Sequence, residues 1–175
     1  MKTVLVTGGI ASGKSEVCSH LKALGYPVYD CDSRAKALYA SYPDLKRKVE
    51  EAAGLPFERL KEIFSDAPKV AAVEAVVHPA VSQDFISWRN SLPANCTLAF
   101  MESAIAAEKP LLRPLYDSIL LVSAPLKTRL SRRAGIEDRA ALQHPEDIKA
   151  DYIIENDSDL GTLRAKTEEF LKTIL

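Results

Sequence analysis

Residues 4–15 read Val-Leu-Val-Thr-Gly-Gly-Ile-Ala-Ser-Gly-Lys-Ser, and from Gly8 onward they match the phosphate-loop pattern G-x-x-x-x-G-K-[ST]. A short strand, Thr3–Thr7, is expected before the loop and a helix from Ser15 to about Leu24 after it. This order places a glycine-rich turn between a buried strand and a helix N-terminus, where backbone N–H groups bind phosphate oxygens. A chance glycine-rich turn is the alternative. The complete pattern and its context favour a nucleoside-triphosphate site.

Each position of this loop has a chemical reason to be there. The glycines permit positive φ values and the close backbone approach that side chains would forbid. We expect the Lys14 ammonium group to reach the β- and γ-phosphates and the Ser15 hydroxyl to bind Mg²⁺. The predicted nucleotide-binding residues are Gly8, Gly9, Ile10, Ala11, Ser12, Gly13, Lys14 and Ser15.

The composition of the 175 residues limits the functions to consider. The chain is 47% hydrophobic and 27% charged, and its net charge of −1 gives no sign of nucleic-acid or anionic-membrane binding. No apolar stretch approaches the ~20 residues of a membrane span, and no signal-peptide pattern opens the sequence. Cys18, Cys31 and Cys96 are odd in number and widely spaced, as is typical of reduced thiols. We therefore expect one cytoplasmic domain.

Short apolar segments alternate with helical patterns along the chain, which indicates an open parallel sheet of the α/β class. Val4–Val6 and Ile119–Val122 are continuous apolar runs, as in strands buried on both faces. Ligands of such sheets bind outside the carboxyl ends of the strands. The expected strands are Thr3–Thr7, Val28–Cys31, Leu98–Met101, Ile119–Val122 and Tyr152–Glu155.

The segment between the second and third strands, residues 33–95, contains helical patterns but no convincing strand. An insertion at this edge of the sheet is well placed to cover a second substrate. Further helices are expected at Leu126–Arg133 and Leu160–Leu175. Pro79 is expected to end the helix that precedes it. The helices expected within the insertion are Ser33–Ala40, Pro43–Ala53, Phe57–Ser65, Pro68–Val77 and Pro79–Asn90.

Two aspartates, in the sequence Asp30-Cys31-Asp32, end the second expected strand. In an extended backbone, residues two apart point the same way, so both carboxylates would face one site. Phosphoryl transfer to a hydroxyl needs alignment, charge neutralisation and a carboxylate that accepts the proton. One aspartate is expected to accept it, while the other holds a Mg²⁺-bound water or an N-cap. The alternative is that Asp32 only caps the helix that follows.

Charged residues near the ends of later strands are candidates for contacts with Mg²⁺ or phosphate. Glu102 follows an apolar strand and is placed to hold Mg²⁺ through water, although many strands simply end in an acid. Arg129, Arg132 and Arg133 recur at helical spacing, which is also typical of a solvent-exposed face. A guanidinium group suits the oxygens of a transferring phosphoryl group, and Arg133 and Arg139 are favoured for that contact.

Four motifs occur in an order similar to that of a known family: the loop Thr7–Ser15, Asp30-Cys31-Asp32, Phe64-Ser65-Asp66 and His78-Pro79. This order resembles the dephospho-coenzyme A kinases, which open T-G-G-I-x-S-G-K-S, end their second strand D-x-D and carry F-x-D and then L-x-x-x-x-H-P in a helical insertion. The resemblance extends over essentially the whole chain. It implies a three-layer α/β/α P-loop kinase with a five-stranded parallel sheet, a helical substrate-binding insertion and a short lid.

The resemblance implies transfer of the ATP γ-phosphoryl group to the ribose 3′-hydroxyl of dephospho-coenzyme A, with Mg²⁺. By position, Asp32 resembles the catalytic acid placed to accept the hydroxyl proton, and Lys14 and Ser15 match the phosphate and magnesium residues. Asn156 resembles the asparagine near the adenine. The other residues that the resemblance assigns are Lys36, His78 and Glu108 at the acceptor and Arg133 and Arg139 at the phosphates.

A single domain is expected, with core segments 1–32, 96–128 and 151–175, an acceptor-binding insertion 33–95 and a lid 129–150. The chain departs from the family pattern in two places. The segment Ala104–Glu108 lacks the proline of P-L-L-x-E, and Ala134 stands where an aspartate usually follows the first lid arginine. The lid is also several residues shorter than usual, so it is expected to exclude less water.

Two other functions stay open on these residues. A nucleoside or nucleotide kinase would share the architecture but not the F-x-D and His-Pro insertion. A nucleotide-binding sensor without turnover is suggested by the altered lid, although Lys14, Ser15 and Asp32 are intact. His78, considered alone, also fits a structural capping residue. In the favoured interpretation the protein acts on a small molecule, as a monomer or weak homo-oligomer, without nucleic acid or membrane partners.

Overall fold

The computed structural model describes residues 1–141 and 143–175, apart from the side chains of Arg139 and Ala141. The described chain divides into two compact units, Met1–Tyr29 with Pro93–Leu175 and Asp30–Leu92. The first unit carries the sheet and the phosphate loop, and the second is helical. No helix in the described residues is long and apolar enough to cross a membrane.

The first unit is built on a parallel sheet. Its strands are β1 (Lys2–Thr7), β2 (Val28–Asp30), β3 (Leu98–Glu102), β4 (Ser118–Ser123) and β5 (Tyr152–Glu155), in the order β2-β3-β1-β4-β5. Val6 of the central strand lies opposite Glu102 of β3 and Leu120 of β4. The phosphate loop therefore leaves the centre of the sheet, next to the carboxyl end of β3. This five-stranded parallel sheet confirms the predicted α/β fold.

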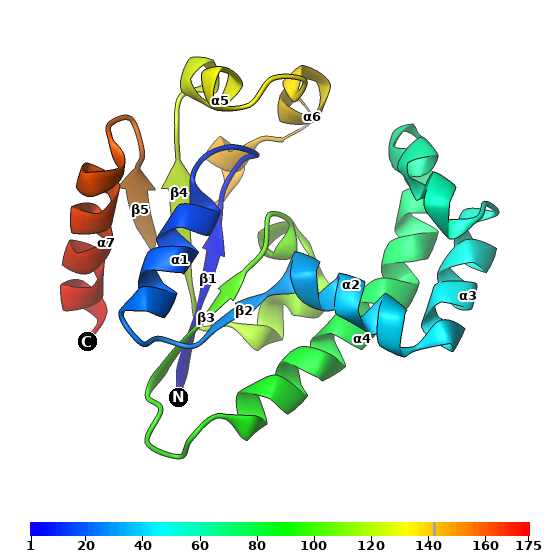
Figure 1. Ribbon diagram of the computed structural model, residues 1–175, viewed down its shortest axis with the longest axis horizontal. Coiled ribbons are helices and arrows are strands. Elements are labelled where there is room, and N and C mark those ends of the chain that lie inside the picture. Colours follow the sequence, from blue (N-terminus) through cyan, green and yellow to red (C-terminus); the bar gives the residue numbers. More distant parts are fainter. Residues whose placement is uncertain (142) are drawn as a thin grey trace. The chain divides into compact units, whose positions relative to one another are not determined.

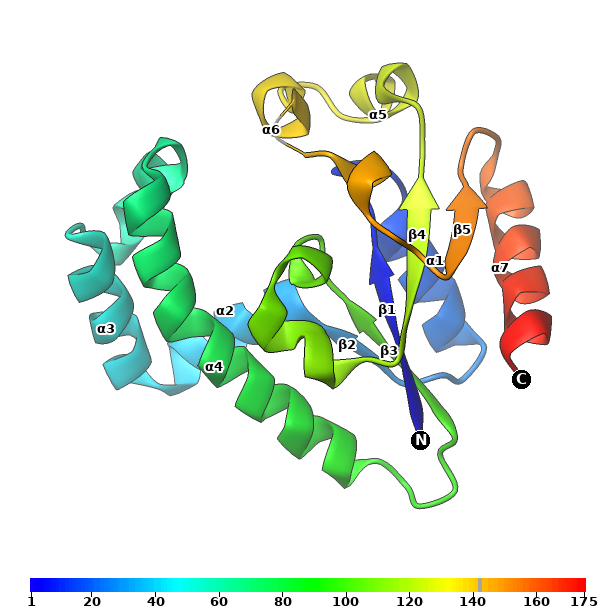
Figure 2. The same ribbon diagram turned by 180° about the vertical axis from the view of Figure 1, so that it is seen from behind.

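Helices α1 (Lys14–Ala23) and α7 (Leu160–Ile174) cover one face of this sheet (Figure 1). Val4 and Val6 point to that face and pack with Val17 of α1 and Phe170 of α7 in one apolar cluster. Leu5, between the two valines, is buried on the other face. The 3₁₀ segments η2 (Ala106–Glu108) and η3 (Pro110–Leu115) lie over that second face (Figure 2). Burial on both faces explains the continuous apolar runs, since each such side chain contributes about 1.5–3 kcal/mol.

The segment between β4 and β5 contains the short helices α5 (Leu126–Arg132) and α6 (Glu137–Ala141) and the 3₁₀ turn η4 (Pro145–Asp147). It packs on the phosphate loop through a small apolar cluster of Ile10, Ile136 and Ala140, with Leu130 at its edge. The isoleucine in the loop thus has a packing role, because it attaches this segment to the loop.

The second unit consists of α2 (Cys31–Ser41), α3 (Pro43–Ala53), the 3₁₀ segment η1 (Phe57–Ser65) and α4 (Ala67–Ser91). Arg34 of α2 donates two hydrogen bonds to Asp84 of α4, Nε to Oδ2 at 2.7 Å and Nη2 to Oδ1 at 2.6 Å. Tyr39 packs edge-on against Phe57. These contacts join the helices into one body.

The proline in α4 corrects one expectation from the sequence. Pro79 lies inside a continuous helix, so the prediction that it ends a helix is wrong. An internal proline removes one backbone hydrogen bond and costs about 3 kcal/mol. The Asp66 side chain caps α4 by accepting from Lys69 N at 3.2 Å, and packing against α2 and α3 offsets the cost of the proline.

Candidate active site

The phosphate loop between β1 and α1 takes backbone conformations that explain its glycines. Gly8 has a φ of +146° and Gly13 a φ of +105°, where a side chain would be strained. A Cβ at Gly8 would also collide with the Val122 carbonyl oxygen, and one at Gly13 with Nδ2 of Asn156. Gly9 is needed for a different reason, because a Cβ there would collide with the Arg129 guanidinium.

Lys14 and Ser15 begin α1 at the end of this loop. Nζ of Lys14 donates to the Gly9 carbonyl oxygen at 3.2 Å, so its ammonium group lies back over the loop. Oγ of Ser15 donates to Oε1 of Glu102 at 2.8 Å. The pairing of β1 with β3 brings these two residues together, since Glu102 lies opposite Val6, two residues before the loop. A hydroxyl and a carboxylate oxygen are the ligand types that Mg²⁺ prefers, so these two residues fit that ion.

Asn156, directly after β5, is bonded to the loop. It is buried, and its Nδ2 donates to the Ser12 carbonyl oxygen at 2.7 Å. Nη2 of Arg132 donates to Oδ1 of Asn156 at 3.1 Å, and Nη1 donates to the same Ser12 oxygen at 3.4 Å. Asn156 also lines a hollow of about 310 Å³ together with Gly13 and Leu160. Its position beside the loop is compatible with the expected place near adenine, although the amide itself bonds to Ser12.

The three arginines at residues 129–133 have different surroundings. Arg129 is buried against Gly9, with 6% of its surface exposed, and Arg132 bonds to the loop and Asn156. Arg133, which the sequence favoured, caps the C-terminus of α5 and is exposed. The side chain of Arg139 lies outside the described residues. Spacing alone could not reveal which member of the series is buried, because all three fit one helical turn.

Gln143 is a second loop contact for which the sequence held no signal. Its Oε1 accepts a hydrogen bond from the Ile10 backbone N–H at 2.7 Å. A single glutamine in a polar segment has no distinguishing pattern. The contact becomes visible only when α6 and Ile10 are seen in one apolar cluster.

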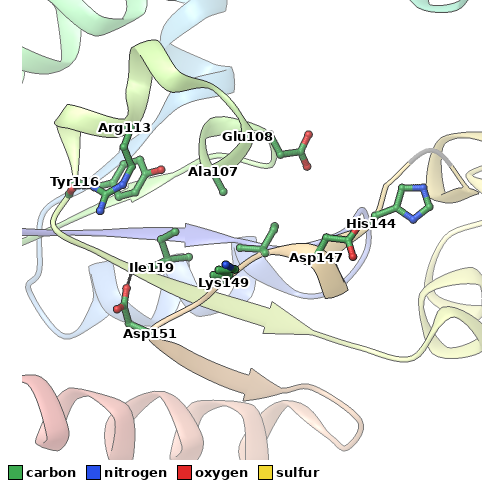
Figure 3. A pocket seen from close by; sticks show the side chains of 10 residues that line it. Ala107, Glu108, Arg113, Tyr116, Ile119, His144, Asp147, Lys149 and Asp151 are labelled. Carbon is green, nitrogen blue, oxygen red and sulfur yellow. Dashed lines mark hydrogen bonds between the residues drawn. The ribbon is translucent and has the colours of Figure 1, made fainter.

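A cavity of about 680 Å³ lies in the first unit, between the η2–η3 segment and residues 144–151 (Figure 3). Glu108 and Asp147 lie toward one end, and Arg113 and Tyr116 toward the other. Burial raises the pKa of Tyr116, whose hydroxyl donates to the Ala106 carbonyl oxygen at 3.4 Å. The lining residues are Ala107, Glu108, Arg113, Tyr116, Ile119, His144, Asp147, Ile148, Lys149 and Asp151. Glu108, expected at the acceptor, thus borders a space that can hold a ligand.

The remaining candidates, Asp32, Lys36 and His78, belong to the second unit. Strand β2 ends at Asp30 and the backbone is helical from Cys31. The prediction that the carboxylates of Asp30 and Asp32 point the same way assumed an extended backbone through Asp32, so it is wrong. Asp30 is the N-cap of α2 and accepts from Ser33 N at 3.1 Å and from Ser33 Oγ at 2.6 Å. The alternative in which Asp32 caps the helix is therefore wrong. Asp32 is exposed in the first turn of α2.

A glycine-rich loop between the central strand and α1, with a lysine over the loop and a serine bonded to a strand-end glutamate, defines a P-loop kinase. Similar folds include shikimate kinase from Acinetobacter baumannii, with a TM-score of 0.57 at 16% identity over 99% of this chain and 93% of that chain. The dephospho-CoA kinase family model matches residues 2–161. The chain belongs to the dephospho-CoA kinase family.

Individual relatives agree with this assignment. The dephospho-CoA kinase of Porphyromonas gingivalis is 38% identical over 150 residues, covering 81% of this chain and 73% of the relative. That of Thermus thermophilus is 36% identical over 186 residues, covering 97% and 88%. The solved structure of TT1252 from Thermus thermophilus superposes with a TM-score of 0.79 at 32% identity, covering 99% of this chain and 98% of that one. The resemblance found in the motifs is confirmed.

Proposed function

We propose that this chain transfers the γ-phosphoryl group of ATP to the ribose 3′-hydroxyl of dephospho-coenzyme A, giving coenzyme A in the last step of that cofactor's synthesis. Membership of the family over residues 2–161 supports this activity. The observation that carries it is the intact phosphoryl-transfer apparatus, in which Lys14 lies over the loop and Ser15 is bonded to Glu102. The substrate is a small molecule and the phosphoryl donor is ATP.

Ser15 and Glu102 would hold Mg²⁺ in this proposal. Their oxygens are 2.8 Å apart in a hydrogen bond that a cation would replace with two ligand contacts, directly or through water. When bound with ATP, Mg²⁺ neutralises charge on the β- and γ-phosphates. Lys14 adds a positive charge on the same phosphates, and the N–H groups at the start of α1 provide further donors.

Asp32 is proposed to accept the proton of the 3′-hydroxyl. It is exposed and lies in the first turn of α2. Lys36, one turn further along α2, and His78 of α4 are proposed to bind the acceptor within the insertion 33–95. Glu108 is proposed to contact the acceptor from the core, and the 680 Å³ cavity that it lines supports a ligand there.

The lid, residues 129–150, is proposed to bring Arg133 and Arg139 to the phosphates, and Asn156 is proposed to lie near the adenine. The chain is proposed to consist of a core (1–32, 96–128 and 151–175), an acceptor-binding insertion (33–95) and this lid. A cytoplasmic protein, monomeric or a weak homo-oligomer, is also proposed. The thiol state of the three cysteines supports the location, and the net charge of −1 supports the lack of a nucleic-acid partner.

The test is a coupled assay of ADP release in which dephospho-coenzyme A, nucleosides and nucleoside monophosphates are offered in turn. Only dephospho-coenzyme A is expected to stimulate release. The variant Asp32→Asn should lower kcat roughly 10²- to 10⁴-fold while ATP still binds. No acceptor-stimulated release by the wild-type protein would refute the kinase activity. Full activity of Asp32→Asn beside an inactive Lys14→Ala would refute the role of Asp32 alone.

A further inference from the structure

Arg129 is a buried arginine of α5 beside the phosphate loop. Its Nε and Nη1 are fully enclosed and make no hydrogen bond in the part of the chain that the structure describes. The residue as a whole is 6% exposed. Buried guanidinium groups are normally paired with a carboxylate or bonded to carbonyl oxygens, because burying a charge without a partner costs free energy.

No described carboxylate neutralises this charge by direct contact. The pKa of the exposed Glu146 is lowered mainly by a hydrogen bond to its own backbone N–H and by one from His144, and Arg129 is the smallest contributor. Nδ1 of His144 lies 3.2 Å from Oε1 of Glu146. The Glu146 carboxylate thus contacts His144 directly, and its interaction with Arg129 is only a weak electrostatic attraction without a hydrogen bond.

The unpartnered donors are directed at the phosphate loop. The Arg129 guanidinium lies so close to Gly9 that a Cβ on this glycine would collide with Nη1. Cζ and Nε of Arg129 would also lie near that Cβ. Nζ of Lys14 donates to the carbonyl oxygen of the same glycine. Two cationic groups therefore converge on Gly9. Such a concentration of positive charge beside an anion-binding loop favours the binding of an anion.

We propose that Arg129 binds the triphosphate of ATP, with its unpartnered N–H groups donating hydrogen bonds to a phosphate oxygen next to Gly9. This inference rests on the proposed ATP site. Arg129 is already desolvated before ATP arrives, so the protein pays no further cost to bury its charge on binding. The folded protein without ATP carries the cost of the unpaired charge, and the bound phosphate removes that cost.

The proposal predicts opposite effects of one substitution on stability and on binding. Arg129→Met removes the unpaired charge and keeps most of the apolar side-chain volume. Without ligand, its thermal unfolding midpoint should equal or exceed that of the wild type. Its affinity for inorganic tripolyphosphate, a probe with no adenine, should fall roughly tenfold or more, as expected for the loss of a charged hydrogen bond. Arg164→Met, at an exposed arginine of α7, is the matched control and should change neither quantity.

Arg129→Lys adds a second comparison, since it retains the charge without the planar guanidinium group and should bind tripolyphosphate with intermediate affinity. Two outcomes would overturn the proposal: tripolyphosphate affinity of Arg129→Met within about twofold of wild type, or a midpoint well below wild type, which would show a structural role. If wild-type protein binds tripolyphosphate but does not phosphorylate dephospho-coenzyme A, the kinase activity fails and the role of Arg129 stands. If wild-type protein binds neither ATP nor tripolyphosphate, both fail.

Discussion

Two segments of the phosphate loop, Gly9–Ile10 and Ser12–Gly13, are held in different ways. The Ser12 carbonyl accepts hydrogen bonds from Asn156 and Arg132, and Gly13 packs directly on the Asn156 amide. The Gly9–Ile10 segment is instead held by Lys14 and Gln143 and faces the unpartnered donors of Arg129.

The difference separates support from ligand binding within one short loop. Around Ser12–Gly13 the side chains of Asn156 and Arg132 hold the backbone, so changes there should lower stability first. Around Gly9–Ile10 two donors of Arg129 have no partner among the described residues, so changes there should lower nucleotide affinity first. A substitution in each segment, measured by both unfolding and binding, tests this separation.

The largest effect on stability is expected at Asn156. Asn156→Ala removes the donor to Ser12 and the acceptor for Arg132, which should lower the free energy of unfolding by about 2–3 kcal/mol in urea. Asn156→Asp keeps an oxygen for Arg132 and should lose less. A loss below about 1 kcal/mol in Asn156→Ala would show that the Ser12–Gly13 segment does not depend on this residue.

The two glycines give the next largest contrast. Gly13→Ala forces a side chain into a φ of +105° and against Asn156, at an expected cost of about 1–3 kcal/mol in urea unfolding. Gly9→Ala requires no positive φ and meets only the end of the Arg129 side chain, so it should destabilise the protein less than Gly13→Ala while affinity for ATP falls. Equal destabilisation by the two variants would contradict the separation of the segments.

Gln143 should give a smaller effect. Gln143→Met keeps the length of the side chain but loses the acceptor for the Ile10 N–H, so hydrogen exchange of that amide should speed up roughly fivefold, as expected for about 1 kcal/mol. Gln143→Glu retains an acceptor oxygen and serves as the control for the hydrogen bond. Unchanged exchange in the methionine variant would show that packing of Ile10 in its apolar cluster is what protects the amide.

The strands and the loop were predictable from the sequence because their signals are local. Val4–Val6 and Ile119–Val122 are apolar runs that only a doubly covered strand requires, and G-x-x-x-x-G-K-[ST] specifies its own backbone. The continuation of α4 through Pro79 depends on packing against α2 and α3, which no local pattern records. At Asp30 the short-range capping bond with Ser33 ends the strand earlier than the apolar pattern suggested.

The site shows the same division between local and distant causes. The sequence predicts a place for Glu102 beside the phosphate loop because this acid follows an apolar strand, and in the structure Glu102 is hydrogen-bonded to Ser15. Its contact with Mg²⁺ stays a prediction. Arg129 and Gln143 could not be singled out, because burial of one arginine among three and the reach of one glutamine depend on how residues 126–143 pack on the loop. Interactions of that kind become visible only in three dimensions.

The smallest effect is expected beyond Asn156, where Asp159 caps α7. Its carboxylate accepts from Thr162 N at 2.9 Å, and this hydrogen bond is the main reason why the pKa of Asp159 is lowered from 3.8. Because the folded state favours the ionised form, the cap stabilises the protein fully above that value and loses its effect as the pH falls through the lowered pKa. Asp159→Asn should therefore lower the thermal midpoint slightly at neutral pH, and the difference from wild type should shrink as the pH falls below 3.8. A pH-independent difference in midpoint would show that the charge of Asp159 contributes nothing to the cap.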